Sequence, residues 1–324
     1  MTQSWKPFNY LCVLRLCVEI RHMPADNIHR LATEQQNTAS ADLDTLSALE
    51  IARIMNAEDA KVPQAVSAAL PQVAKVIDAV ASAIGKKGRL IYVGAGTSGR
   101  LGALDSSECP PTFNTDPKTI QYVIAGGPKA LGAAVEANED SPELGRKDIA
   151  KLKPGKNDVV VGIAASGRTP YTIAACEYAK KKGAKTACVV CNTGSPLAAA
   201  VNYPIEVDVG PEVIAGSTRL KAGTAQKLIL NMITTGAMTR LGYVYGNLMV
   251  NVHLKNEKLV ERGVGIVQKA TGASRDEAIH VLKLAKNRAN VAIVMIEAGL
   301  MPKGAEKRLK KTNGHVRKAI GKGY

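Results

Sequence analysis

The sequence is poor in aromatic residues and contains no long apolar run. Among its 324 residues there are two Phe and one Trp, and aromatic residues make up 4% of the chain. This balance excludes a β-sandwich rich in Tyr and Trp and favours a helix-rich α/β protein. No stretch of about 18 or more apolar residues occurs, so we expect no membrane-spanning segment and no membrane partner.

Cysteine is also scarce. The six cysteines lack the paired spacing of a metal site, so we expect no metal. Cys188 and Cys191 form a C-x-x-C pair, but they lie in an apolar run where alternation sends the two side chains to opposite faces of a strand. The sequence therefore predicts buried free thiols and a reducing compartment.

The charge of the chain is strongly positive and unevenly spread. Lysine and arginine exceed the acidic residues by 15, and residues 301–324 hold eight basic side chains against one acidic side chain. A nucleic-acid reader would interleave aromatic residues with these charges, and this segment offers only Tyr324. We expect a solvated basic helix and no nucleic-acid partner. The alternative is a contact with another polyanion, which would depend steeply on salt.

The pattern of apolar residues predicts an α/β fold. Two amphipathic helices are expected over residues 43–54 and 66–84, on either side of Pro63. Five short apolar runs follow, separated by helical segments such as Lys129–Glu139. The runs are Arg89–Val93, Ile120–Ala125, Asp158–Ala164, Lys185–Cys191 and Pro204–Val209. Their spacing predicts a doubly wound sandwich with a mostly parallel five-stranded sheet.

Three parts are expected along the chain. Residues 1–37 form an N-terminal extension that we expect to be partly disordered, with Met23 as a candidate physiological start. Residues 38–262 form the α/β domain with its N-terminal helices. Residues 263–324 form a small helical module of about three short helices, because Ser274 and Glu277 make a capping box and Gly299 with Pro302 ends a helix.

Hydroxyl and glycine residues gather where strands are expected to end. Ligands of such a sheet bind beyond the carboxyl ends of the strands. Thr97 and Ser98 follow the first strand, and Ser166 and Thr169 follow the third. Hydroxyls and free backbone N–H groups at a strand-to-helix turn bind phosphate without a metal. Each loop read alone is equally typical of an ordinary helix cap.

Two further features bear on the ligand. Ser217 and Lys221 lie in a third hydroxyl-rich cluster that opens a long helix. The first loop has the glycines of a dinucleotide fingerprint, but the strand over residues 120–125 runs into glycines where that fingerprint needs an acidic residue. We therefore expect no nicotinamide cofactor.

Two glutamates supply candidate acid and base groups. Glu108 lies behind the first phosphate loop and just before Pro110 and Pro111, which are expected to end the helix. Glu139 follows the second strand's crossover. A glutamate at an arbitrary position usually lies on a solvated face, which is the alternative for both.

Six strings, in this order and spacing, carry a family resemblance. They are GAGTSGRLG, DSSECPPTF, IAGG, AVEANEDS, GIAASGRTPY and GSTRLKAGTAQKLILNM. They resemble the N-acetylmuramic acid 6-phosphate etherase family of the sugar isomerase (SIS) superfamily, over roughly residues 37–317. The resemblance implies a cytoplasmic lyase of amino sugar catabolism and peptidoglycan recycling, which splits off D-lactate and leaves N-acetylglucosamine 6-phosphate. It implies no cofactor.

The resemblance also implies roles for residues. Glu108 would protonate the departing lactate oxygen and Glu139 would remove the C2 proton, although the order of the two roles is less secure than the pair. Ser98, Ser166 and Thr169 would contact the phosphate. Weaker candidates for the phosphate or the lactyl carboxylate are Arg168, Arg219 and Lys221. The family resemblance implies a homodimer.

Two other functions stay open at this point. An aldose–ketose isomerase would use the same base at C2 and the same sugar-phosphate pocket, but it would release no lactate. A non-catalytic sugar-phosphate sensor would bind the ligand without turnover, and the presence of both glutamates argues against it.

Overall fold

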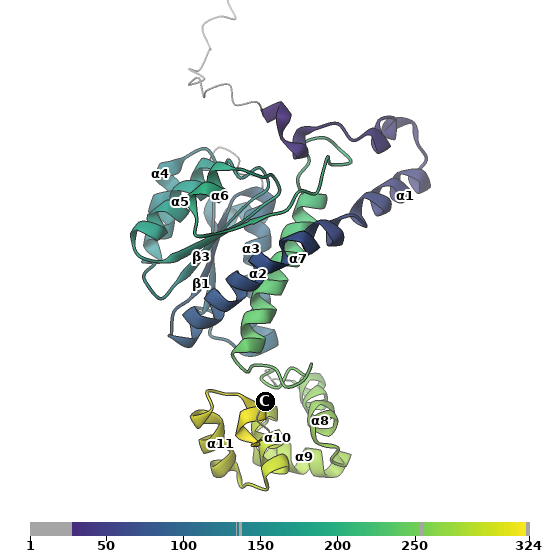
Figure 1. The fold of residues 1–324 in the computed structure, drawn as a ribbon. Coiled ribbons are helices and arrows are strands. Elements are labelled where there is room, and N and C mark those ends of the chain that lie inside the picture. The colour runs from purple at the N-terminus through teal and green to yellow at the C-terminus, as the bar shows by residue number, and fades with distance from the viewer. Residues whose placement is uncertain (1–27, 134, 136–137, 253, 255, 322–324) are drawn as a thin grey trace, which may run out of the picture.

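The computed structural model describes residues 28–133, 135, 138–252, 254 and 256–321. An α/β domain and a small helical module follow each other along the chain (Figure 1). Residues 1–27 of the expected extension, including the candidate start at Met23, lie outside the described residues. Residues 28–45 form four 3₁₀ turns, η2 (Ile28–Arg30), η3 (Ala32–Glu34), η4 (Thr38–Ser40) and η5 (Leu43–Thr45).

The α/β domain is built on one five-stranded sheet. Its strands are β1 (Leu90–Gly94), β2 (Ile120–Ile124), β3 (Val159–Ala164), β4 (Lys185–Val190) and β5 (Tyr203–Glu206). Their order is β2-β1-β3-β4-β5, and each neighbouring pair is parallel. Every residue of β1 and β3 is buried, as a parallel strand covered on both faces requires. The predicted doubly wound parallel sheet is confirmed.

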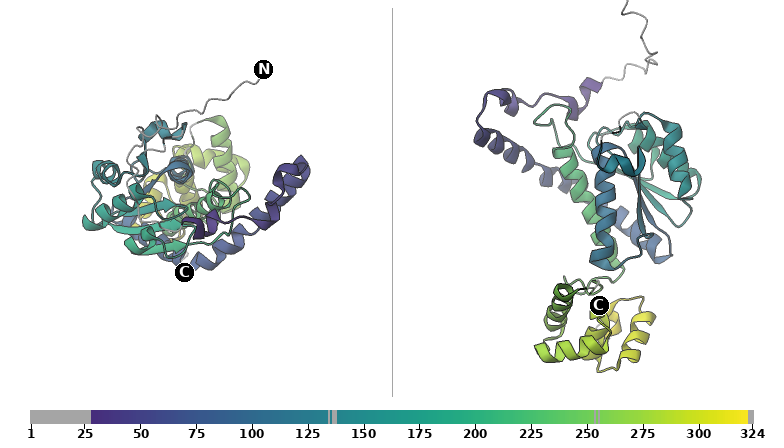
Figure 2. Two further views of the ribbon diagram at one scale, coloured as in Figure 1. Left: turned by 90° about the horizontal axis from the view of Figure 1, so that it is seen from above. Right: turned by 180° about the vertical axis from the view of Figure 1, so that it is seen from behind.

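Helices cover both faces of this sheet (Figures 1 and 2). One face carries α2 (Val62–Gly85), α3 (Gly96–Phe113) and α7 (Lys221–Arg240). The other carries α4 (Pro142–Lys151), α5 (Pro170–Lys181) and α6 (Pro196–Ala200). Cys191 packs in the first layer and Cys188 in the second, so the prediction that their side chains point to opposite faces is confirmed.

The first N-terminal helix begins later than the apolar pattern predicted, and the second, which starts at Val62, begins earlier. α1 (Ala48–Asp59) starts at Ser47, whose side chain forms a capping box with Glu50. Among the described residues, the segment 48–85 is long and apolar enough to cross a membrane, with a mean hydropathy of 1.2. Its second helix, α2, buries Val66, Val73 and Val80 against the sheet domain, which is typical of a core helix.

Two local expectations are wrong. The described residues of Lys129–Glu139 form no α-helix: Gly126 and Gly127 have φ of 85° and 65°, and a 3₁₀ turn, η6 (Gly127–Leu131), begins at the second of them. The helix of this crossover is α4, capped by Ser141. Pro110 does not end α3 either, because it sits in the last turn, where Asn114, with φ of 55°, closes the helix by donating to its carbonyl oxygen.

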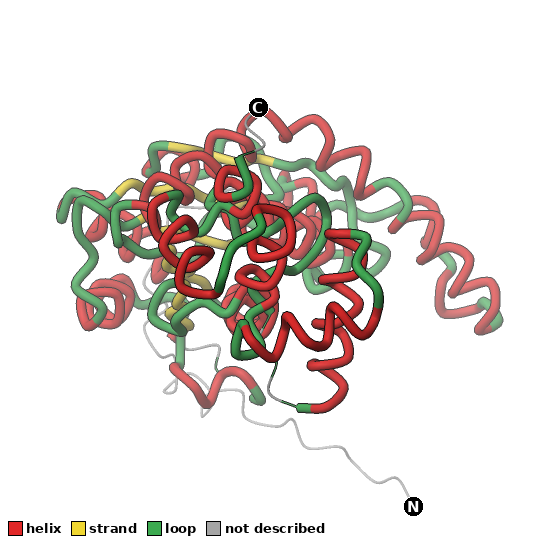
Figure 3. The backbone as a smooth tube through the Cα atoms, turned by 90° about the horizontal axis from the view of Figure 1, so that it is seen from below, coloured by secondary structure: helices red, strands yellow, loops and turns green. Residues whose placement is uncertain are grey.

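The C-terminal module has its own hydrophobic core. It comprises α8 (Glu257–Thr271), α9 (Arg275–Leu284), α10 (Ala289–Ala298), α11 (Pro302–Lys311) and α12 (Val316–Ala319), and so exceeds the three helices expected. Ala305, Leu309 and Val316 from the basic tail are buried in this core. Residues 301–321 of the tail are therefore part of a folded unit. Figure 3 shows the helices of the whole chain in red.

Candidate active site

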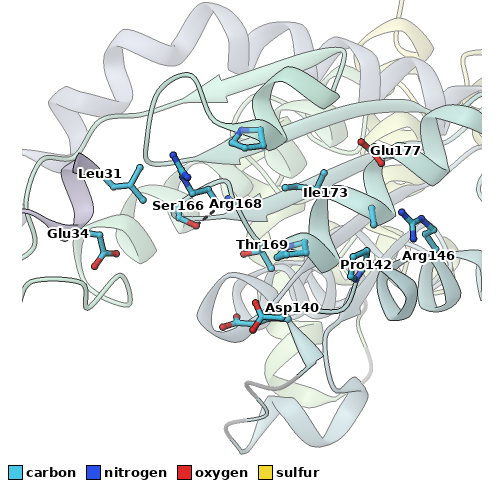
Figure 4. Close-up of a pocket in the computed structure, with 14 residues that line it drawn as sticks. Leu31, Glu34, Asp140, Pro142, Arg146, Ser166, Arg168, Thr169, Ile173 and Glu177 are labelled. Carbon is cyan, nitrogen blue, oxygen red and sulfur yellow. Dashed lines mark hydrogen bonds between the residues drawn. The ribbon is translucent and has the colours of Figure 1, made fainter. Parts of the chain in front are cut away.

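A cavity of about 660 Å³ opens at the carboxyl edge of the sheet (Figure 4). Its walls come from the loop after β3, the first turns of α5, the segment before α4 and the 3₁₀ turn η3. This is the edge at which ligands of doubly wound sheets bind. Ser166, Arg168, Thr169 and Glu139 all line it, so the structure brings these four predicted site residues together.

The loop after β3 is shaped by Gly167. Its φ is 67°, and a Cβ at this position would lie 2.3 Å from Ser195 Oγ, so only glycine fits. The Ser166 hydroxyl accepts a hydrogen bond of 3.2 Å from the Arg168 N–H. Thr169 is the N-cap residue of α5, whose first backbone N–H groups lack intrahelical acceptors. Pro170 has no N–H and the N–H of Tyr171 donates to the carbonyl oxygen of Glu139, so it is the helix dipole that favours an anion here.

Glu139 reaches the cavity from the segment before α4. It is half-buried, and its carbonyl oxygen accepts a 3.0 Å hydrogen bond from the N–H of Tyr171 in α5. Asp140 lines the cavity beside it. A carboxylate is thus held next to the hydroxyl loop by the main chain.

The first predicted phosphate loop faces α7 and does not line this cavity. Gly99 approaches β1 so closely that a Cβ would lie 2.8 Å from the oxygen of Gly94. Ser98 is buried, and its hydroxyl donates a 2.9 Å hydrogen bond to Gln226 Oε1. Thr97 packs near Gly223 of the same helix. Both hydroxyl residues contact the start of α7.

Lys221 lies in a buried ion pair. Its ammonium is 2.7 Å from Glu58 Oε2, and its side chain is 2% exposed. Burial favours a higher pKa of Glu58, but hydrogen bonds from Lys221 and Lys61 outweigh that effect and lower the pKa to about 2. Ser217 lies in the turn before this helix, where its N–H donates to the oxygen of Ile214. Neither Lys221 nor Ser217 lines the cavity.

Glu108 lies on α3 and lines a different, smaller cavity of about 250 Å³. Lys227, Asn231 and the buried Asp105 line this cavity too. Burial raises the pKa of Asp105, whose carboxylate accepts hydrogen bonds of 2.9 Å from the Tyr92 hydroxyl and 2.8 Å from Asn231. α3 and α4 cover opposite faces of the sheet, so one chain does not bring Glu108 into the cavity that Glu139 lines.

Sequence reasoning missed several residues of the larger cavity. Asp140 follows Glu139 directly, and its carboxylate could have been predicted from the same position after the second strand. Leu31 and Glu34 line the cavity from a segment that the sequence predicts as part of the N-terminal extension. No motif in the sequence marks either residue. Within the described part of the chain, no group of three His, Cys, Asp or Glu side chains that could hold a metal is found.

Two family models match the α/β domain. Residues 72–180 match the glucokinase regulatory protein N-terminal SIS domain, and residues 149–236 match the SIS domain. A phosphoheptose isomerase from Francisella tularensis is similar in structure. It is 18% identical, with a TM-score of 0.48, and the match covers 60% of this chain and all of that one.

Several curated relatives match nearly the whole chain. The N-acetylmuramic acid 6-phosphate etherase 2 of Vibrio parahaemolyticus is 51% identical over 91% of this chain and 98% of its own length. The N-acetylmuramic acid 6-phosphate etherase of Streptomyces avermitilis is 52% identical over 90% of this chain and 94% of its own. This chain therefore belongs to the N-acetylmuramic acid 6-phosphate etherase family.

Proposed function

We propose that the protein cleaves the D-lactyl ether of N-acetylmuramic acid 6-phosphate and yields N-acetylglucosamine 6-phosphate and D-lactate. The observation that carries this proposal is the placement of the Glu139 carboxylate beside the Ser166–Thr169 loop in one cavity, in a chain of this family. The protein is then a lyase of amino sugar catabolism that serves peptidoglycan recycling. We also infer a cytoplasmic location, since the four described cysteines are free thiols.

The chemistry needs one base and one acid. In the open-chain sugar the C2 proton is α to the aldehyde, so a carboxylate can remove it. The electron pair left at C2 forms the C2–C3 double bond as the C3–O bond breaks, and an acid protonates the departing lactate oxygen. Water then adds to C3 and a proton returns to C2. We assign the C2 proton to Glu139 and the lactate oxygen to Glu108.

The phosphate fits the start of α5. Ser166 and Thr169 line the cavity there, and the positive end of the α5 dipole lies at the same place. The Arg168 side chain adds a positive charge to this wall. We assign Lys221 to holding α7 through Glu58, and Ser98 to fixing α3 against Gln226, because those groups are already engaged. Thr97 and Ser217 support the same loops.

Glu108 has to reach the substrate from a second copy of the chain. An open apolar groove of about 640 Å³ runs between α2 and α7, with Leu70, Ile77 and Met232 in its walls. Asn231 lines both this groove and the Glu108 cavity, so the two are neighbours. Leu70 and Leu104 are 43% and 49% exposed in the single chain. We propose a homodimer that covers this groove and joins Glu108 of one subunit to the Glu139 cavity of the other.

A lactate assay tests the function. The purified protein, without added metal or nucleotide, is expected to release one D-lactate for each N-acetylglucosamine 6-phosphate formed. An isomerase would return all the carbon in one phosphosugar. A sensor, which the match of residues 72–180 to a regulatory protein's domain also allows, would bind the sugar phosphate without turnover. Either of these results would reject the etherase.

A further inference from the structure

The segment over residues 28–40, which we call the N-terminal strap, is bonded to the carboxyl edge of the sheet. Thr33 is fully buried, and its hydroxyl accepts a 3.1 Å hydrogen bond from Asn192, just after β4. Its carbonyl oxygen accepts a 3.0 Å hydrogen bond from the N–H of Gly216. Ser40 donates a 2.8 Å hydrogen bond to the oxygen of Val213. The strap is therefore fixed over the edge where the cavity opens.

The side chains of the 3₁₀ turn η3 and its N-cap residue point in two directions, into the cavity and into the protein interior. Side chains three positions apart in such a turn lie on the same side. Leu31 and Glu34 have this spacing, and both line the cavity, whereas Thr33 points into the protein toward Asn192. The bonds that hold Thr33 in place therefore also hold the Glu34 carboxylate at the cavity wall.

Glu34 has an unusual environment for a carboxylate. It is half-buried and lies against Gly216, where a Cβ would come 2.9 Å from its Oε2. Within the described residues, its carboxylate has no hydrogen bond or ion pair with another side chain. It stands at one end of the cavity, with Arg146 and Glu177 at the other and the Ser166 loop between them (Figure 4).

We propose that Glu34 binds the substrate directly by accepting a hydrogen bond from an uncharged donor of the sugar, either the acetamido N–H at C2 or the hydroxyl at C4. This inference rests on the proposed function. A carboxylate is an acceptor only, so it binds a donor and repels both the phosphate and the lactyl carboxylate. With the phosphate bound at the start of α5, the Glu34 carboxylate determines the orientation of the sugar in the cavity.

Two substitutions test this role in the full-length protein. Glu34→Gln keeps the size and loses the charged acceptor, and Glu34→Ala removes the group. We expect KM for the ether substrate to rise about 10- to 100-fold with little change in kcat, as for a lost hydrogen bond to a charged group. Asp42→Asn, at an exposed carboxylate just beyond the strap, is the control.

The donor is identified by calorimetric binding of three ligands to wild type and Glu34→Gln. These are N-acetylglucosamine 6-phosphate, its 4-deoxy analogue and 2-deoxyglucose 6-phosphate. If the acetamido N–H is the partner, the substitution no longer weakens binding of 2-deoxyglucose 6-phosphate. If the C4 hydroxyl is the partner, it no longer weakens binding of the 4-deoxy analogue.

The negative outcomes are separate for the two proposals. Unchanged KM and dissociation constants in Glu34→Gln, or an equal loss with all three ligands, would overturn the role of Glu34 even if the wild-type protein releases lactate. Absence of lactate from wild type would overturn the proposed function instead. Thermal unfolding of both variants checks that they fold, and Glu34→Asp, which keeps the acceptor, is expected to recover part of the affinity.

Discussion

The backbone N–H of Tyr171 donates a 3.0 Å hydrogen bond to the carbonyl oxygen of Glu139. This bond joins the segment before α4 to the first turn of α5. The segment that carries the proposed base is therefore linked to the segment that carries Ser166 and Thr169. The main chain therefore fixes the separation between the backbone of the proposed base and the proposed phosphate site.

Glu139→Gln should abolish lactate release and leave sugar-phosphate binding nearly intact. The substitution keeps the shape of the side chain and removes the base that takes the C2 proton. A coupled D-lactate assay measures turnover, and calorimetry with N-acetylglucosamine 6-phosphate measures binding. Glu143→Gln, an exposed glutamate in the first turn of α4, is the control. A wild-type rate in Glu139→Gln would reject the assignment.

Mixing two inactive variants tests the shared site. If Glu108 and Glu139 of one site come from different subunits, a dimer of one Glu108→Gln chain and one Glu139→Gln chain contains one intact site. Equal mixing with subunit exchange should then restore about a quarter of the wild-type rate, because half the dimers are mixed and each has one working site of two. If each site lay within one chain, the mixture would stay inactive.

The buried pair of Lys221 and Glu58 should contribute strongly to stability. Removing one partner leaves a buried charge without compensation, so Glu58→Gln should lower the free energy of unfolding at pH 7 by about 3–5 kcal/mol. Asp78→Asn, which breaks an exposed pair with Arg240, should cost less than about 1 kcal/mol. Urea unfolding measures both, and similar losses would contradict the argument.

The same pair predicts a pH dependence. The pKa of Glu58 is about 2 in the folded chain and 4.5 without the fold, because the hydrogen bonds from Lys221 and Lys61 outweigh the effect of burial. A lowered pKa gives stability that is complete above pH 4.5 and is lost as the pH falls toward 2. The difference in unfolding free energy between wild type and Glu58→Gln should therefore shrink over that range. A constant difference would contradict this account.

Thr33→Val should loosen the N-terminal strap. The substitution removes the acceptor for Asn192 at nearly constant volume, so we expect KM to rise about 3- to 10-fold with kcat nearly unchanged. Thr33→Ser keeps the hydroxyl and should restore the KM of wild type. Thr45→Val, whose hydroxyl bonds only within an exposed turn, is the control. Failure of Thr33→Ser to restore KM would show that the hydroxyl is not what matters.

The buried cysteines should resist labelling. Burial raises the pKa of Cys109, Cys188 and Cys191 to about 12, so almost no thiolate exists at pH 8. In a variant with Cys12→Ser and Cys17→Ser, an aromatic disulfide reagent should react only after unfolding in urea. Rapid labelling of the native protein would show that at least one of the four described thiols is accessible.

The sequence by itself determined the sheet and one wall of the site. Continuous apolar runs between helical segments are enough to mark buried parallel strands, and hydroxyl residues after such a run mark the edge at which ligands bind. This pattern, with the family resemblance, predicted Ser166 and Thr169, which line the cavity, and also Thr97 and Ser98, which do not. The prediction of a helix over Lys129–Glu139 is wrong because Gly126 and Gly127 adopt positive φ. The periodicity of apolar residues does not predict such backbone angles.

Only the tertiary structure decided which polar groups face the cavity. Ser98 follows a strand of the sheet as Ser166 does, and Lys221 is a cation at a helix start, yet Ser98 bonds Gln226 and Lys221 bonds Glu58. Glu34 carries no local signal, because its position depends on Thr33 bonding to Asn192, 159 residues away. The local sequence pattern indicates which chemistry a side chain offers. Which groups that side chain contacts depends on how distant segments of the chain pack. The short-range periodicity of the sequence carries no information on that packing.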